Sequence, residues 1–335
     1  MFNLPLLDKM LSAFFNGKKK FLLNDKLNCM ITPVILIIFV IIVSTKQNIG
    51  KPLNCITPTE FRSGWEEFVE NYCFLNGVYP AAANESLPLR SKNCSNFYVW
   101  VLIILSLQSL LFYVPYVVWC YITRLSIINC KIFQGSKNIE FYNIAVFTLK
   151  GSSFVDKNYY SLMYMLLKIM FIINIFLQYY IYCKLLNANY FLWGVDVLSN
   201  NYVENFNYIN YCDFYFRTLG NSIQEYTIQC FLSINYFNKI IFIFLWFWLI
   251  ILFCVNLFSV LHFIITFLHV YRMQHFKRYL KCQHLDRFVN KFISSDIYLL
   301  FQFIENDSNI IDTNNFCAQL YKIYIESEFN KDVVA

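Results

Sequence analysis

Four long apolar segments dominate the pattern of hydrophobic and polar positions along the chain. A helix needs about 20 residues to cross a hydrocarbon core of about 30 Å, and the segments that meet this length are residues 27–45, 97–122, 162–186 and 240–270. The more polar stretches around them are residues 1–26, 46–96, 123–161, 187–239 and 271–335. The pattern predicts an all-α membrane protein with four transmembrane helices, two outer loops and a helical tail.

The composition excludes a soluble globular protein. Of the residues, 58% are hydrophobic and only 14% are charged, and a soluble domain could not hide so much apolar surface. Of the 27 Lys and Arg residues, five lie in 46–96 and two in 187–239. Since Lys and Arg concentrate in cytoplasmic segments near span ends, we expect both termini and residues 123–161 in the cytoplasm.

The first span is expected to stay in the chain as a signal anchor. Some 26 residues precede it, including Lys18, Lys19, Lys20 and Lys26, and no small-residue cleavage site follows it. A cleaved signal peptide would have such a site.

The polar residues that we singled out within the spans are uncharged: Gln108, Asn174, Gln178 and Asn256. They predict hydrogen bonds between helices, each worth roughly 0.6 kcal/mol. Alternatively, these side chains line a water-filled path. Pro115 removes one backbone hydrogen bond inside the second span and predicts a kink, which serves either packing or gating.

Aromatic and basic residues mark the ends of the spans. Phe97, Tyr98 and Trp100 begin the second span, as is typical of anchors at a membrane interface. A basic cluster follows the fourth span, at Arg272, His275, Lys277, Arg278 and Lys281. It fits the bias of Lys and Arg toward the cytoplasm and makes membrane lipids an expected partner.

Two pairs of cysteines, Cys55/Cys73 and Cys212/Cys230, each enclose 17 residues within the two outer loops. Thiols outside the cytosol oxidise and stay oxidised, so these four residues predict extracellular disulfides. Four cysteines allow three pairings, and their spacing does not choose among them.

The other cysteines give weaker signals. A bond between Cys94 and Cys183, both near the outer side, is conceivable, and unlinked thiols are the alternative. Those in the membrane or cytoplasm are expected to stay reduced: Cys29, Cys120, Cys130, Cys254, Cys282 and Cys317. No CxxC or His-x-Cys spacing predicts a metal site.

No catalytic chemistry is indicated. The four histidines lack the carboxylate or cysteine spacing of a catalytic or metal centre; they are His262, His269, His275 and His284. There is also no Gly-rich phosphate loop and no basic patch away from the spans. The sequence predicts no enzyme, no cofactor and no nucleic-acid partner.

Several separated blocks resemble the innexins, the invertebrate gap-junction proteins. The run from Cys55 to Cys73 is similar to their first extracellular loop. The blocks similar to the second loop and fourth span are Tyr211-Cys-Asp-Phe, Arg217-Thr-Leu-Gly, Tyr226-Thr-Ile-Gln-Cys230, Ile234-Asn-Tyr-Phe-Asn and Ile241-Phe-Ile-Phe-Leu-Trp-Phe-Trp248. Phe97-Tyr98-Val99-Trp100 stands where innexins have Tyr-Tyr-Gln-Trp, and Ser233 where they usually have proline, which suggests a divergent member.

The resemblance implies a gap-junction channel subunit in the plasma membrane, assembled in a ring of eight innexin-type chains that docks with the hemichannel of an adjacent cell. It also implies the loop-to-loop disulfides Cys55–Cys230 and Cys73–Cys212, with pairing inside each loop as the alternative. The tail would belong to a cytoplasmic helical dome.

The amino-terminal segment has apolar residues close to an i, i+3, i+4, i+7 spacing over residues 1–15, which predicts an amphipathic helix. On the residues alone it would be an anchor on the cytoplasmic leaflet. The resemblance favours a helix folded into the pore mouth, with Phe2, Asn3 and Leu4 in the pore funnel.

Two alternatives to a docking channel stay open. Asn84 and Asn93 begin N-glycosylation sequons in the first outer loop, and a bulky glycan at the docking rim would give an unpaired hemichannel, as in pannexins. A non-conducting four-span adhesion or scaffold protein, like tetraspanins or claudins, has the same topology. Ion or dye flux distinguishes the scaffold from both channels.

Overall fold

The computed structural model describes residues 23–61, 63–80, 96–125, 154–186, 191–198, 206–217, 223–266, 268–280, 285–307 and 310–332. The chain divides into two compact units, and the boundaries between them fall inside the apolar segments. The sheet unit comprises residues 32–111 and 175–251. The tail unit comprises residues 1–31, 112–174 and 252–335.

Four helices are long and apolar enough to cross a membrane, which confirms the predicted all-α membrane class. The candidate spans are Asn24–Asn48, Phe97–Ile122, Asn158–Leu185 and Ile234–Ile265. The elements that contain them are α2 (Leu23–Lys26), the π-helical turn η2 (Leu27–Ile31), α3 (Thr32–Asn48), α6 (Phe97–Leu125), α8 (Phe154–Leu185) and α10 (Ile234–Ile265). Pro115 lies inside the continuous helix α6, and its kink stays a prediction.

The fourth span begins earlier and ends earlier than the apolar pattern predicted. α10 starts at Ile234, within the expected loop, because the polar side chains of Asn235 and Asn238 are buried in its first turns. It ends at Ile265, where the Arg272 Nε–H donates a 2.8 Å hydrogen bond to the carbonyl of Thr266. Residues 268–270 therefore do not continue this helix.

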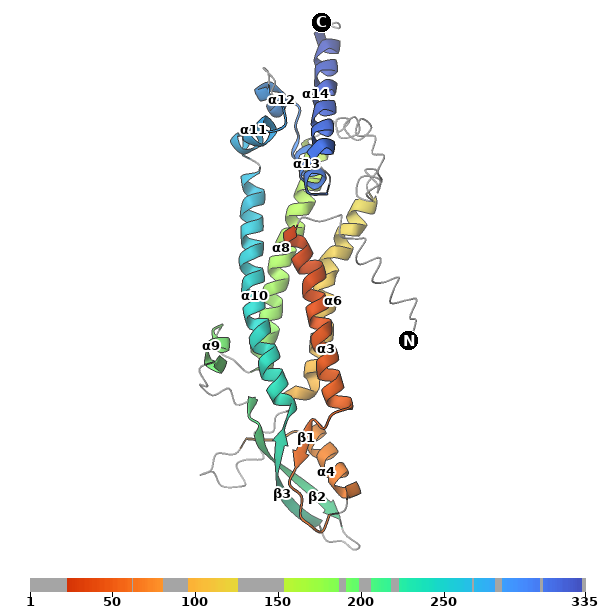
Figure 1. Cartoon of the computed structure of the whole chain (residues 1–335), viewed down its shortest axis with the longest axis vertical. Coiled ribbons are helices and arrows are strands. Elements are labelled where there is room, and N and C mark those ends of the chain that lie inside the picture. Colours follow the sequence, from red (N-terminus) through yellow and green to blue (C-terminus); the bar gives the residue numbers. More distant parts are fainter. Residues whose placement is uncertain are drawn as a thin grey trace. The chain divides into compact units, whose positions relative to one another are not determined.

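The sheet unit contains a three-stranded antiparallel sheet that the sequence analysis did not predict (Figure 1). Its strands are β1 (Leu53–Cys55), β2 (Ile209–Arg217) and β3 (Ile223–Leu232), in the order β1-β3-β2. Cys55 lies opposite Cys230 in the register of β1 and β3. Along β2 the residues Asn210, Cys212 and Phe214 are buried in alternation, the period-2 pattern of a strand with one covered face.

Two further helices belong to this unit. α4 (Ser63–Asn76) contacts β1 and β2, and α9 (Trp193–Leu198) lies beside α10 (Figure 1). Both outer loops therefore contain regular structure that covers or extends the sheet and spans.

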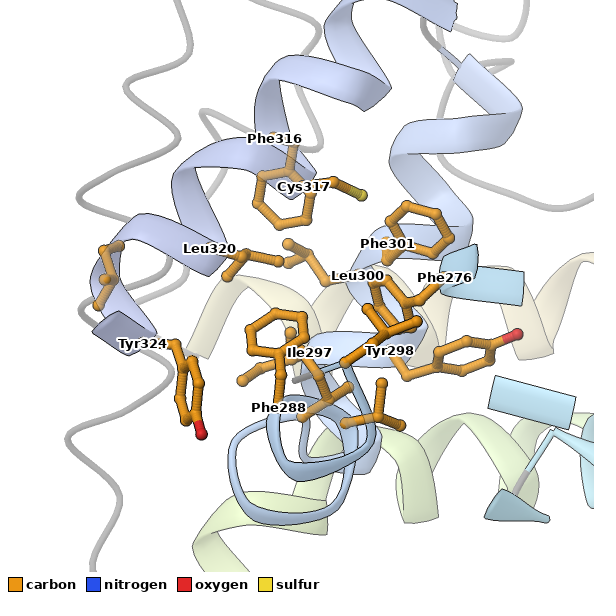
Figure 2. Packing of buried hydrophobic residues seen from close by; sticks show 14 of the residues in the cluster. Phe276, Phe288, Ile297, Tyr298, Leu300, Phe301, Phe316, Cys317, Leu320 and Tyr324 are labelled. Carbon is orange, nitrogen blue, oxygen red and sulfur yellow. The ribbon is translucent and has the colours of Figure 1, made fainter. Parts of the chain in front are cut away.

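The tail unit adds α11 (His269–Lys277), α12 (Leu285–Lys291), α13 (Ser295–Asp307) and α14 (Ile310–Asp332). The pattern predicted a helical tail, and these four helices lie in it. Figure 2 shows how Phe276, Phe288 and Phe301 pack with Leu320 of α14 in a common apolar core. The helices are thus held by burial of large side chains, which contributes about 1.5–3 kcal/mol per side chain.

Truncating Phe301 should open this core. Phe301 is fully buried, so Phe301→Ala is expected to cost about 3–5 kcal/mol. Cys317 is a buried free thiol in the same core (Figure 2), and burial raises its pKa to about 12. We expect Cys317 to be alkylated at least about tenfold faster in purified Phe301→Ala than in the unmodified protein, as measured by peptide mass spectrometry. Ile311→Ala, at an exposed position of α14, is the control, and equal rates in both variants would contradict the packing described.

Candidate functional site

Two disulfides hold the sheet unit together. Cys55 of β1 is bonded to Cys230 of β3, and Cys73 of α4 is bonded to Cys212 of β2. The bonds join residues 175 and 139 positions apart, and their pairing is the one that the resemblance implied. The bonds therefore tie β1 to β3 and α4 to β2.

The two bridges are close neighbours. The sulfur atoms of Cys55, Cys73 and Cys230 lie within 4.8 Å of one another. Among the described residues this is the only group with metal-ligand spacing, but all three sulfurs are in disulfides and none can supply the thiolate that a metal binds. The cluster is a crosslinked centre for the sheet.

An aromatic cluster stiffens the same sheet. The Phe61 ring lies 5.5–6.1 Å from four other aromatic rings, those of Trp65, Phe214, Phe216 and Tyr226. On the same strand, next to Phe214, the carboxylate of Asp213 accepts 2.7 Å hydrogen bonds from the hydroxyls of Tyr79 and Thr227. Packed rings and paired polar groups leave this region little conformational freedom.

One face of α4 carries exposed apolar side chains. Trp65, Phe68 and Leu75 are each more than half exposed, and they follow one another at i, i+3 and i+10, with Tyr72 on the same face at i+7. The rings of Phe68 and Tyr72 stack at 6.3 Å. An apolar stripe outside the candidate spans is typical of a protein-contact surface.

The aromatic residues at the start of α6 divide between two roles. Tyr98 is buried, and its hydroxyl donates to the carbonyl of Phe74 in α4 at 3.1 Å while its own carbonyl accepts from Gln47 of α3 at 3.2 Å. Phe97 is also buried, against Phe206. Trp100 is half exposed, so among the three it alone fits the expected interface anchor.

The tail unit contains a buried ion pair that the sequence analysis missed. Lys168 Nζ lies 3.0 Å from the carboxylate of Asp25, and their side chains are 3% and 1% exposed. Lys168 also donates to Ser259 Oγ at 2.7 Å and lies over the ring of Tyr164, whose hydroxyl donates to Asp25. The sequence analysis singled out only uncharged polar residues within the spans and overlooked this charged pair. The sequence did contain a signal for this pair. Lys168 lies inside the third apolar segment and Asp25 lies just before the first one, and charged residues at such positions usually pair with each other.

Uncharged polar residues make the expected bonds between helices. The amides of Asn28 and Asn256 exchange two hydrogen bonds of 2.9 Å. The Tyr182 hydroxyl donates to Gln108 at 2.7 Å. For Gln108 and Asn256, the prediction of interhelical hydrogen bonding is confirmed. Asn174 and Gln178 are buried in α8.

Asp296 joins α13 to α8 within the tail unit. Its carboxylate accepts hydrogen bonds from the backbone N–H groups of Tyr160 and Ser161, at 3.1 and 2.8 Å. Burial raises the pKa of Asp296 to about 6, although both N–H donors act to lower it. This carboxyl therefore titrates near neutrality.

His275 of α11 and Glu305 of α13 are paired with each other. His275 contacts the hydroxyl of Tyr298 at 2.8 Å and the carboxylate of Glu305 at 3.2 Å, and Tyr279 donates to Glu305 at 2.6 Å. Burial acts to raise the pKa of Glu305, but these hydrogen bonds outweigh it and hold that pKa below its usual value. Of the predicted basic cluster, Arg272 and His275 thus serve as internal contacts.

Several predicted residues lie outside the described parts of the chain: Phe2, Asn3, Leu4, Asn84, Asn93 and Cys94. Cys183 is a free cysteine, so the bond to Cys94 that the sequence analysis considered is not formed.

The fold and the site are those of a four-span membrane protein whose outer loops form one disulfide-linked sheet. The sequence model of the innexin family matches residues 23–324, and the chain belongs to the innexin family. Three relatives from Caenorhabditis elegans are Innexin-3 (28% identical, covering 99% of this chain and 90% of the relative), Innexin eat-5 (26%, 91% and 87%) and Innexin unc-9 (26%, 92% and 93%). Innexins are channel proteins rather than enzymes, so the chain is a gap-junction channel subunit of the plasma membrane.

Removing the cation of the buried pair should destabilise the protein strongly. Lys168→Met leaves the Asp25 carboxylate buried without its charge partner, which costs about 3–5 kcal/mol. The double variant Asp25→Asn/Lys168→Met should lose much less stability than Lys168→Met alone. The measurement is the fraction of detergent-purified protein that stays unaggregated after heating. Lys184→Met, at an exposed lysine of the same helix, is the control, and equal losses in Lys168→Met and Lys184→Met would refute the role of the pair.

The raised pKa of Asp296 predicts a pH dependence. A carboxyl whose folded pKa exceeds its unfolded value favours the fold in its neutral form, so its contribution grows as pH falls through about 6 toward about 4. Between pH 7.5 and 5.5 the gain is at most about 1 kcal/mol after screening by solvent. The melting temperature of the unmodified protein, relative to Asp296→Asn, should therefore rise by roughly 1 °C. A difference that stays constant or falls in acid would contradict this assignment.

Proposed function

We propose that the chain passes ions and small solutes directly between adjacent cells, in a channel whose docking surface is the disulfide-linked sheet. Both termini and residues 123–161 would then face the cytoplasm. Two features support this orientation. The disulfides need an oxidising compartment, whereas the tail unit holds the free thiol Cys317, and few Lys and Arg residues lie in the loops of the sheet unit.

The pore in this proposal lies between chains. Within one chain, Lys168 and Asp25 neutralise each other out of contact with water, so this pair supplies no charged lining for a private conduit. The exposed stripe of α4, from Trp65 to Leu75, offers a surface for another innexin-type chain, identical or different. A ring of eight is carried over from the resemblance, as is the placement of Phe2, Asn3 and Leu4 in the pore funnel.

The observation that carries the proposal is the pair of adjacent disulfides. Each crosslink is worth about 2–4 kcal/mol, because it restricts the unfolded chain. Together with the aromatic cluster around Phe61, the crosslinks hold the sheet in one shape before a partner is met. A rigid surface pays less ordering entropy on docking, which suits contact between two preformed channels.

Breaking one bridge should abolish coupling between cells. We expect Cys55→Ser to lower junctional conductance at least about tenfold in paired cells expressing the chain, measured by double voltage clamp, because losing a native disulfide costs about 2–5 kcal/mol. Cys183→Ser removes an unbonded cysteine and should leave the conductance unchanged. Surface biotinylation shows whether Cys55→Ser reaches the membrane.

A second experiment does not depend on whether Cys55→Ser folds, because it reduces the disulfides of the unmodified chain. A membrane-impermeant phosphine reductant, applied to single cells before pairing, should prevent coupling by the unmodified chain. Current only in single cells at low external calcium would replace the proposal with an unpaired hemichannel and direct attention to Asn84 and Asn93. No current in either arrangement, despite surface expression, would favour a non-conducting scaffold.

A further inference from the structure

The segment Phe191–Leu198 lies outside the four candidate spans but is largely apolar. It reads Phe-Leu-Trp-Gly-Val-Asp-Val-Leu, with a single charged residue, Asp196. Its last six residues form α9. Such an apolar segment is unusual in a polar loop. The residues that it contacts therefore help to show whether it lies in water or in the membrane.

Two aromatic residues of the spans hold this segment in place. The Phe191 carbonyl accepts a 3.0 Å hydrogen bond from Trp246 Nε1 of α10 and another from the Tyr179 hydroxyl of α8. The rings of Phe191 and Tyr179 stack at 4.9 Å, and the buried Trp193 meets Trp246 edge to face at 6.5 Å.

The contact with α10 is tight enough to need a glycine. A Cβ atom on Gly194 would lie 2.3 Å from Cδ2 of Trp246, closer than real side chains approach. The backbone of α9 therefore rests directly on the tryptophan ring. The segment is fastened to the side of the spans at fixed positions.

Those fastening points lie within the spans, not beyond their ends. Tyr179 precedes the end of α8 at Leu185 by six residues, and Trp246 follows the start of α10 at Ile234 by twelve. With a rise of 1.5 Å per residue these separations are about 9 and 18 Å along the helices. The segment therefore lies level with membrane-spanning residues.

The outward face of the segment is apolar. Phe191, Leu192, Val195 and Leu198 are 47–62% exposed. The ring of Phe247 in α10 packs edge to face against Trp246 at 4.8 Å and is itself partly exposed, so α10 carries exposed apolar surface beside the segment. Interfacial helices bury their apolar face about 5–10 Å into the boundary between headgroups and acyl chains.

We propose that Phe191–Leu198 is inserted into the leaflet nearest the sheet and forms a lipid-contact site whose ligand is phospholipid acyl chain. Continuity with the exposed apolar surface of α10 assigns lipid as the occupant. The site depends on the four spans and not on the proposed conductance.

Photocrosslinking tests this placement. The purified full chain would carry p-benzoylphenylalanine in place of Leu192 or Leu198, in liposomes of phosphatidylcholine with radiolabelled acyl chains. After irradiation we expect a radiolabelled lipid adduct at both positions, at least about fivefold above that at Tyr215, an equally exposed position on β2. Mass spectrometry of the modified peptide confirms the site of the adduct.

Two results would overturn the proposal. A crosslink between two chains, visible as a doubled mass on a denaturing gel, would make this face a subunit contact. An adduct level no higher than at Tyr215 would place the segment in water. Since neither readout needs current, failure here is distinguishable from failure of the channel function.

Discussion

The covalent connection of the outer loops is the constraint on which the rest of the sheet unit depends. A sheet of three strands, one of them only three residues long, has little apolar area of its own and would be marginal in water. The two bridges tie β1 to β3 and α4 to β2, and so also fix the chain where it leaves α3 and enters α10. The buried Tyr98 then attaches α6 to α4. Crosslinks that are few but central thus set the geometry of the loops and of the helix ends to which they connect.

The tail unit is held together by different physics. An ion pair out of water is costly to form and costly to break, because either charge alone would be buried without compensation. Here the Lys168 ammonium has three favourable neighbours, in Asp25, Ser259 and the ring of Tyr164. These contacts connect the start of the first span to α8 and α10 inside one unit. Such a pair specifies which helices meet more than it adds to stability, and it makes the residues just before the first span part of the folded structure.

Much of this architecture could be predicted from the sequence, and the exceptions have physical causes. Hydropathy identified the spans because each is a long apolar run, and the resemblance supplied the disulfide pairing that spacing alone left open. Hydropathy also concealed Lys168, since one charge changes the mean of a long apolar segment very little. The sheet was missed although Asn210, Cys212 and Phe214 alternate as a strand requires, because the loops were defined only as the polar remainder between spans. The early start of α10 was missed because the asparagines in its first turns are polar yet buried, an environment that only the fold creates.

In the proposed function, chains of this kind form a ring around a pore and meet another ring through their disulfide-linked sheets. Single-particle imaging of the purified protein in lipid nanodiscs tests it most directly. We expect closed rings with an axial opening, and pairs of rings joined sheet to sheet when the disulfides are intact. Isolated single chains, or rings joined through the tail helices α11 to α14, would contradict it.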